Sequence, residues 1–194
     1  MDKKFTILES NTTYNGFFKL ISHTIQHSLF QGGLSQAYTR EVLERGHAVA
    51  VLLHDPQLDQ IVLIEQFRIG AIHSENPWLI ELVAGIVEPG ELPEDVAIRE
   101  AEEECGAQIE NLELITSYFN SAGGSTETTT IYYAHVDAST IEGVHGLDSE
   151  NEDIRVVKMG TQDFLNKVTN NEFNTASLVT AGYWLLSKVS SHAF

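Results

Sequence analysis

The chain has 194 residues, 42% of them hydrophobic, and a formal net charge of −17. This size fits one enzyme-sized globular unit, and no apolar run approaches the ~20 residues that a membrane span needs. The charge argues against a nucleic-acid or anionic-membrane surface, because both are bound by basic patches. The first residues lack the apolar segment of a signal peptide. A single cysteine, Cys105, leaves no internal disulfide, so we expect a cytoplasmic protein.

Polar and apolar residues alternate over much of the first 45 residues. The segments are FKLISHTIQHSLF, a Gly32-Gly33 turn and LSQAYTREVLE. Alternation with a glycine turn predicts antiparallel strands, so residues 1–45 are expected to form a small N-terminal β-meander. About 40 residues cannot bury a core alone, so the meander should pack on the following domain or on a second subunit.

The second predicted domain, residues 46–194, begins with a hairpin of buried strands. AVAVLL and IVLIEQFR flank a turn at His54–Gln57, and WLIELVAG then leads into an acidic segment. ELITSYF, TIYYAHV and IRVVKM follow as strands, and TQDFLNKV and TASLVTAGYWLLSKV as helices. Strands around one helix, with helices added at the end, predict an α/β protein built as an α/β/α sandwich around a mixed sheet.

The acidic segment, residues 85–107, is expected to contain a helix. Pro93 suits its first position and Gly106 supplies a stop, whereas Leu92 stands where a capping Ser or Asp is usual. A set of small or apolar residues recurs at helical spacing and should face the core, leaving the glutamates on a different side. This core set is Val96, Ala97, Ala101 and Cys105.

Three glutamates of this helix fall on one stripe. Glu100 lies three and four residues before Glu103 and Glu104, so their like charges repel by a few tenths of a kcal/mol per pair. A hard divalent cation would offset the repulsion and could also bind substrate phosphates. The alternative is a solvated acidic helix face, which such charge runs usually form.

The whole acidic segment resembles the Nudix box, a glycine, glutamate and arginine pattern of fixed spacing. Its fixed positions here are Gly85, Glu91, Arg99, Glu100, Glu103, Glu104 and Gly106. The segments NGFF, ERGHAVAVLL, VLIEQFRIGA, ELVAGIVEPGE, SAGGSTE and HGLDSENEDIRV extend the resemblance to the ADP-ribose pyrophosphatase branch of the Nudix hydrolases. The resemblance implies a Nudix α/β/α sandwich, hydrolysis of ADP-ribose to AMP and ribose 5-phosphate, and a homodimer with exchanged N-terminal sheets.

The same resemblance implies a metal site and a catalytic base. Glu100 and Glu104 would be the main ligands of Mg²⁺ or Mn²⁺, with Glu103 supporting a further ion and the carbonyl of Ala84 completing a site for about two or three ions. Glu150 would deprotonate the attacking water, Glu152 is its rival, and Glu103 is a further candidate catalytic residue. A solvated acidic loop is the structural alternative for Glu150 and Glu152.

Residues outside the box are implied to bind substrate. Arg68 would clamp the diphosphate, and Arg40 could reach the ligand from the meander, although the branch often has a basic residue where Thr39 stands. Phe17 matches a position that stacks on adenine from the partner subunit, but a buried meander aromatic is the alternative. Gly124 would let the backbone pass close to the terminal ribose, and an ordinary hairpin turn is the alternative.

Other expectations concern structure and specificity. Arg99 is expected to hold Glu91 and Glu103 together. The eight histidines show no metal-ligand spacing. Two further functions stay open: hydrolysis of another nucleoside diphosphate sugar such as GDP-mannose, because the box specifies the diphosphate chemistry alone, and a non-catalytic domain that senses ADP-ribose.

Overall fold

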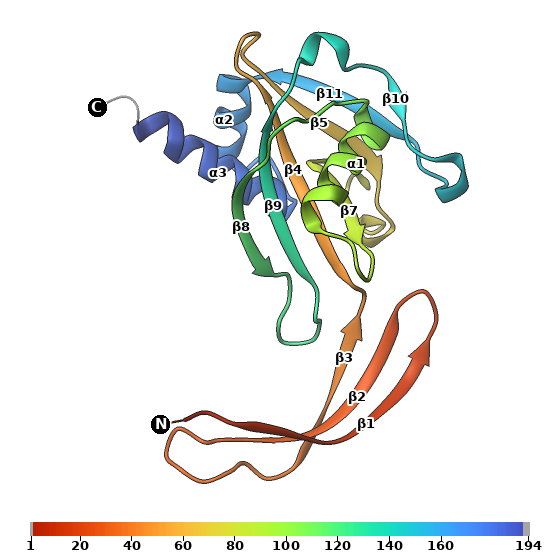
Figure 1. Ribbon diagram of the computed structural model, residues 1–194, viewed down its shortest axis with the longest axis vertical. Helices are drawn as coiled ribbons and strands as arrows, with labels where there is room; N and C mark the ends of the chain where they lie inside the picture. The colour runs from red at the N-terminus through yellow and green to blue at the C-terminus, as the bar shows by residue number, and fades with distance from the viewer. Residues whose placement is uncertain (1, 192–194) are drawn as a thin grey trace. The chain divides into compact units, whose positions relative to one another are not determined.

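The computed structural model describes residues 2–191, and its chain divides into two compact units (Figure 1). Unit 1 contains the residues up to His47 together with Phe119–Thr128. Unit 2 contains Ala48–Tyr118 and the residues from Thr129 onward. The short second segment of unit 1 is the connection between two neighbouring strands of the unit 2 sheet, so the chain passes between the units more than once.

Unit 1 is a three-stranded antiparallel sheet of order β1-β2-β3, which confirms the predicted meander. Its strands are β1 (Phe5–Asn15), β2 (Lys19–His27) and β3 (Tyr38–Glu44). Strand β1 was not singled out in the sequence, because the residues from Glu9 to Thr13 are all polar and give no alternation. The connecting segment joins this sheet through Leu43, whose N–H donates to the Gly124 carbonyl at 2.8 Å.

Unit 2 is built on an eight-stranded sheet of order β10-β11-β5-β4-β9-β8, with β6 paired to β5 and β7 to β4. Because β4 and β9 run parallel whereas β5 is antiparallel to both β4 and β11, the sheet is mixed, as predicted. The strands are β4 (His47–Asp55), β5 (Gln60–Phe67), β6 (Trp78–Glu81), β7 (Val83–Val87), β8 (Glu113–Phe119), β9 (Thr128–His135), β10 (Val144–His145) and β11 (Ile154–Gly160).

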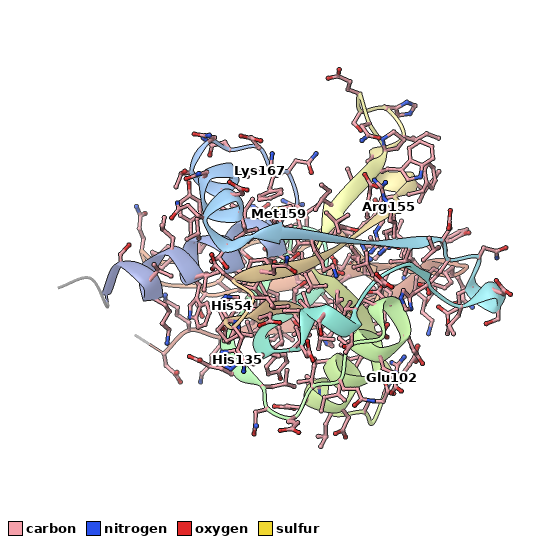
Figure 2. The ribbon with its side chains drawn as sticks, turned by 90° about the horizontal axis from the view of Figure 1, so that it is seen from above. His54, Glu102, His135, Arg155, Met159 and Lys167 are labelled. Carbon is pink, nitrogen blue, oxygen red and sulfur yellow. The ribbon has the colours of Figure 1, made fainter. Side chains whose placement is uncertain are left out.

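Helices cover both faces of this sheet, and Figure 2 shows α1 on one side and α2 and α3 on the other. Their bounds are α1 (Pro93–Cys105), α2 (Thr161–Thr169) and α3 (Ala176–Ser191), with short 3-10 turns η1 (Ile69–Ala71), η2 (Ala138–Thr140) and η3 (Asp148–Glu150). Two buried clusters separate accordingly: one holds the apolar face of α1, the other those of α2 and α3. The predicted α/β/α sandwich is confirmed. No helix among residues 2–191 has the length and apolarity to cross a membrane.

The strands of the β4–β5 hairpin separate beyond Leu53 and Val62, and we call this divergence the fork. The two strands pair only next to their turn, from Leu53 opposite Val62 to Asp55 opposite Gln60. Beyond that point β6 pairs with β5 and β7 with β4. The turn lies at residues 56–59, two residues later than predicted, because the Asp55 carboxylate accepts the N–H groups of Gln57 and Leu58 and places the reversal after it.

Candidate active site

Helix α1 begins and ends as its sequence predicts. Leu92 is an extended N-cap without a side-chain hydrogen bond, and Pro93 opens the helix. Gly106 then adopts a left-handed conformation (φ +71°), and its N–H donates to the Glu102 carbonyl at 2.9 Å. A Cβ at Gly106 would also lie 3.2 Å from the His145 ring, so the glycine allows β10 to approach the end of the helix.

One glutamate of the box is buried. The core set predicted for α1 is buried as expected, but Glu104 is only 2% exposed and lies with that set rather than on a separate side. Its side chain points toward the sheet, where β4 and β5 have separated. There the Ala84 N–H of β7 donates to Glu104 Oε2 at 2.9 Å, and Gln66 Nε2 of β5 donates to Oε1 at 3.5 Å.

Burial changes the acidity of this carboxyl group. Desolvation raises the pKa of Glu104 to about 8, with Glu100 and Glu152 adding to the rise and the Ala84 N–H and Arg68 opposing it. A buried carboxylate with so little compensating positive charge favours a cation beside it.

Glu100 lies directly over the backbone of β7. A Cβ built on Gly85 would stand 2.1 Å from the Glu100 carboxyl carbon, so only glycine permits this approach. Desolvation raises the pKa of Glu100 to about 7; Arg99 opposes the rise, whereas Glu103 and Glu152 add to it. Glu100, Glu104 and Glu152 therefore lie close enough to repel one another.

Arg99 links the acidic turn to the helix. Its guanidinium lies 2.9 Å from Glu100, 3.0 Å from Glu103 and 3.9 Å from Glu91. Glu91 in turn accepts the N–H of Glu88 at 2.9 Å. Arg99 thus contacts both expected partners and also a third, Glu100. Figure 2 shows the intervening Glu102 on the outer side of α1.

The two candidate bases differ in their surroundings. Glu152 Oε2 accepts the Leu147 N–H at 3.2 Å, and its own N–H donates to the Leu147 carbonyl at 3.3 Å. Glu150 is exposed in η3, and its backbone N–H donates to the same carbonyl at 2.9 Å. The loop that carries both, residues 146–153, is attached to α1 because the Gly146 N–H donates to the Glu103 carbonyl at 3.4 Å.

A small pocket of about 240 Å³ lies between the end of β5 and this loop. Arg68 contributes to it and is held by Glu81 of β6, with Nε and Oε2 2.6 Å apart. Its lining is Gln66, Phe67, Arg68, Trp78, Glu150, Asn151, Glu152 and Asp153. A larger hollow of about 1040 Å³ lies beside the β4–β5 turn and the end of β9, and none of the predicted site residues lines it. The smaller pocket is lined by Arg68, Glu150 and Glu152, so we place the candidate site there.

The remaining candidates, Phe17, Arg40 and Gly124, lie in unit 1. Phe17 is 87% exposed, so within a single chain it is not the buried meander aromatic of the alternative interpretation; among the described aromatic side chains its ring contacts Phe18. Arg40 stacks over Tyr38, 4.8 Å from its ring centre. Gly124 lies in a turn closed by its N–H to the Ser121 carbonyl.

The donor set at α1 fits a hard divalent cation. Carboxylates and the Ala84 carbonyl are oxygen ligands, which Mg²⁺ and Mn²⁺ prefer, and two of the carboxylates have pKa values raised by burial. Among residues 2–191 no group of three or more His, Cys, Asp or Glu side chains is already arranged to enclose an ion. Arg99 occupies the carboxylates of Glu100 and Glu103, so binding would require them to turn away from it.

Two residues at the site were not singled out in the sequence, Gln66 and Glu81. Glu81 gave no signal in WLIELVAG, because its role depends on the pairing of β6 with β5. Gln66 did carry a signal: it is a polar residue at the buried end of the apolar run IVLIEQF.

Comparison with known proteins agrees with this geometry. The family model described as NUDIX domain matches residues 44–173. An ADP-ribose pyrophosphatase of Escherichia coli strain K12 is 44% identical over 180 residues, covering 92% of this chain and 86% of that protein. One from Haemophilus influenzae is 43% identical over 183 residues, covering 92% and 84%.

More distant matches agree with this chain in sequence or in fold. A GDP-mannose pyrophosphatase of Cronobacter sakazakii is 34% identical over 144 residues, covering 73% of this chain and 74% of that protein. The crystal structure of an ADP compounds hydrolase superposes with a TM-score of 0.72 at 21% identity, covering 97% and 96%, which is a likeness of fold. With three box glutamates, Glu100, Glu103 and Glu104, on α1 and the family model matching most of the chain, this protein belongs to the NUDIX family.

Proposed function

We propose that this protein hydrolyses the diphosphate of ADP-ribose to AMP and ribose 5-phosphate, assisted by Mg²⁺ or Mn²⁺. The observation that carries the proposal is its 44% identity, over 92% of the chain, to ADP-ribose pyrophosphatases, with every fixed box position retained. Retention of Glu100, Glu103 and Glu104 favours an enzyme over a non-catalytic domain that senses ADP-ribose.

The residues of α1 and β7 would hold the cations. We assign the ligands to Glu100, Glu104 and the Ala84 carbonyl, with Glu103 supporting a further ion, for about two or three ions in all. When bound, the ions supply positive charge that neutralises the diphosphate and polarises its P–O bonds. Gly85 lets Glu100 reach this position, and Arg99 keeps the helix attached to the Glu91 turn.

Arg68 would bind the diphosphate itself. Its guanidinium lies at the pocket, and Glu81 fixes it through a 2.6 Å charged hydrogen bond. One edge of the planar group then stays available for phosphate oxygens, which it can contact through two N–H groups.

Glu150 is the residue that we propose as general base. Its carboxylate is exposed on the pocket wall, whereas that of Glu152 accepts a hydrogen bond from Leu147 and is partly buried. A base on a loop can approach the attacking water after substrate binds and take its proton, while Glu152 keeps the loop in shape.

We also propose a homodimer with exchanged N-terminal sheets. Within β1, β2 and β3, all of whose residues are described, no side chain is buried, and unit 1 exposes large apolar residues that a partner would cover. They include Phe5, Ile7, Phe17, Phe30 and Leu34. In such a dimer Phe17, Arg40 and Gly124 would bind substrate. Sedimentation equilibrium should give twice the mass of the 21.5 kDa chain.

The enzyme is proposed to act in the cytoplasm, a location supported by its single, buried free thiol.

A substrate panel tests the activity. ADP-ribose and GDP-mannose are each incubated with Mg²⁺ in ¹⁸O-water and their products analysed by mass spectrometry. We expect AMP and ribose 5-phosphate, with label in only one of them, and loss of turnover with a chelator. GDP-mannose hydrolysis is the second candidate because a 34% identical relative bears that name; much faster turnover of GDP-mannose would replace the first assignment.

A further inference from the structure

Strand β5 carries a polar residue where its pattern calls for an apolar one. Its residues alternate between the two buried clusters: Ile61 and Leu63 face the cluster of α2 and α3, while Val62 and Ile64 face that of α1. Gln66 is two residues beyond Ile64, so its side chain continues the α1 face. It is 5% exposed, and an apolar residue at this position would have a smaller desolvation penalty.

The amide of Gln66 meets one carboxylate. Its Nε2 donates to Glu104 Oε1 at 3.5 Å, and among the described residues this is the only side-chain hydrogen bond found for Gln66. The other oxygen of Glu104 accepts the Ala84 N–H at 2.9 Å. The carboxylate is therefore held from both arms of the fork, by a side chain of β5 and by the backbone of β7.

We infer that Gln66 is a positioning residue for the metal site, orienting the Glu104 carboxylate before an ion arrives. The inference rests on the proposed function, since it takes Glu104 as a cation ligand. A fixed carboxylate loses less rotational freedom on binding, and partners of metal ligands typically change metal affinity or activity by about 10- to 100-fold when removed. Gln66 also lines the pocket of the candidate site, together with Arg68.

The test is the affinity of the protein for Mn²⁺ alone, measured by isothermal titration calorimetry without substrate. We expect Gln66→Leu to weaken binding by about 10- to 100-fold. Gln60→Leu is the matched control: it alters a glutamine at the opposite end of the same strand and should bind Mn²⁺ like the wild type. Far-ultraviolet circular dichroism and thermal unfolding of the metal-free proteins check that each variant folds.

The rate measured against metal concentration gives a second readout. If Gln66 acts through Glu104, the loss of ADP-ribose turnover in Gln66→Leu should shrink as Mg²⁺ is raised toward saturation, whereas a general packing defect would persist. Should Gln66→Leu fail to fold, Gln66→Met, which is unbranched and closer in shape, takes its place.

The outcomes separate the two proposals. Wild-type affinity for Mn²⁺ in a folded Gln66 variant overturns the positioning role and leaves the enzyme assignment standing. Absence of Mn²⁺ binding and turnover in the wild type overturns the metal-dependent function itself.

Discussion

The Cβ that alanine would add at Gly85 lies 2.1 Å from the carboxyl carbon of Glu100. Two non-bonded carbon atoms cannot lie that close, so either β7 or the Glu100 side chain must move. The first glycine of the box thus serves close packing between a strand and a carboxylate.

Gly85→Ala should therefore impair metal binding more than stability. The atoms that an added Cβ would meet belong to the end of the flexible Glu100 side chain, which can rotate aside, but its displacement removes a proposed ligand. Mn²⁺ titration measures the loss of binding, and urea unfolding measures any change in stability. Gly70→Ala is the control, because a Cβ there meets nothing within 4 Å and the backbone is unstrained; equal behaviour of the two variants would contradict the packing role.

Glu104→Gln should keep the fold and lower turnover by about 10²-fold or more, because it removes the charge that would hold a cation at the diphosphate. The shape of the side chain is retained, so the bond from the Ala84 N–H survives. Steady-state kinetics with saturating Mg²⁺ provide the measurement. Glu102→Gln removes the same charge from the exposed side of α1 and should leave the rate unchanged; near-normal turnover in Glu104→Gln would take this helix out of the catalytic site.

The two loop glutamates should respond differently. Glu150→Gln is expected to lower kcat while Mn²⁺ and substrate affinity stay near wild type, since a base acts on the attacking water alone. Glu152→Ala should weaken the loop, because it removes the Oε2 that accepts the Leu147 N–H, and its defect should appear in KM as well, whereas Glu152→Gln keeps an oxygen that can accept this bond. If Glu152→Gln alone reduces kcat, the base lies two residues further along.

A pH effect on stability is expected far from the box, at His54. Burial lowers the pKa of His54, and nearby His135 lowers it further, against a partial opposing effect of Asp59 and Asp55. Its Nδ1 contacts the Tyr133 hydroxyl at 2.7 Å and its Nε2 the Thr161 hydroxyl at 3.3 Å. The unfolded chain then binds more protons, so this contribution to stability is complete above the usual histidine pKa and declines as pH falls below it.

The variant that tests this is His54→Asn. Urea unfolding at about pH 8 and about pH 5, on either side of the usual histidine pKa, should show a smaller loss of stability for His54→Asn than for the wild type. His73→Asn, at an exposed position, should lose as much as the wild type. An unchanged loss in His54→Asn would mean that the ring titrates like a free histidine.

What the sequence predicts depends on how local the cause is. Helix α1 follows from Pro93 and Gly106, which act within one turn of themselves, and the alternation of β2 and β3 is likewise local. The fork of β4 and β5 is not local: it follows from where β6 and β7 pair, so the roles of Gln66 and Glu81 emerge only in three dimensions.

The burial of two candidate site residues differs from what their sequence suggests. Glu104 was expected on a different side of the helix from the core residues, yet it is buried like Cys105, and its carboxylate accepts hydrogen bonds from β7 and β5. A buried position in the meander was the alternative interpretation of Phe17. The three-stranded sheet of unit 1 buries no side chain of its own strands in a single chain, and Phe17 is exposed.

The thiol of Cys105 has a practical consequence. It is the only cysteine of the chain, fully buried, and desolvation raises its pKa to about 12, so it should stay unmodified by maleimides at neutral pH. A cysteine introduced on the exposed part of β1 would then be the only residue to react with a spin label or fluorophore, and Cys105 would not have to be replaced first. Distances between such labels on two chains can report directly on whether N-terminal sheets are exchanged.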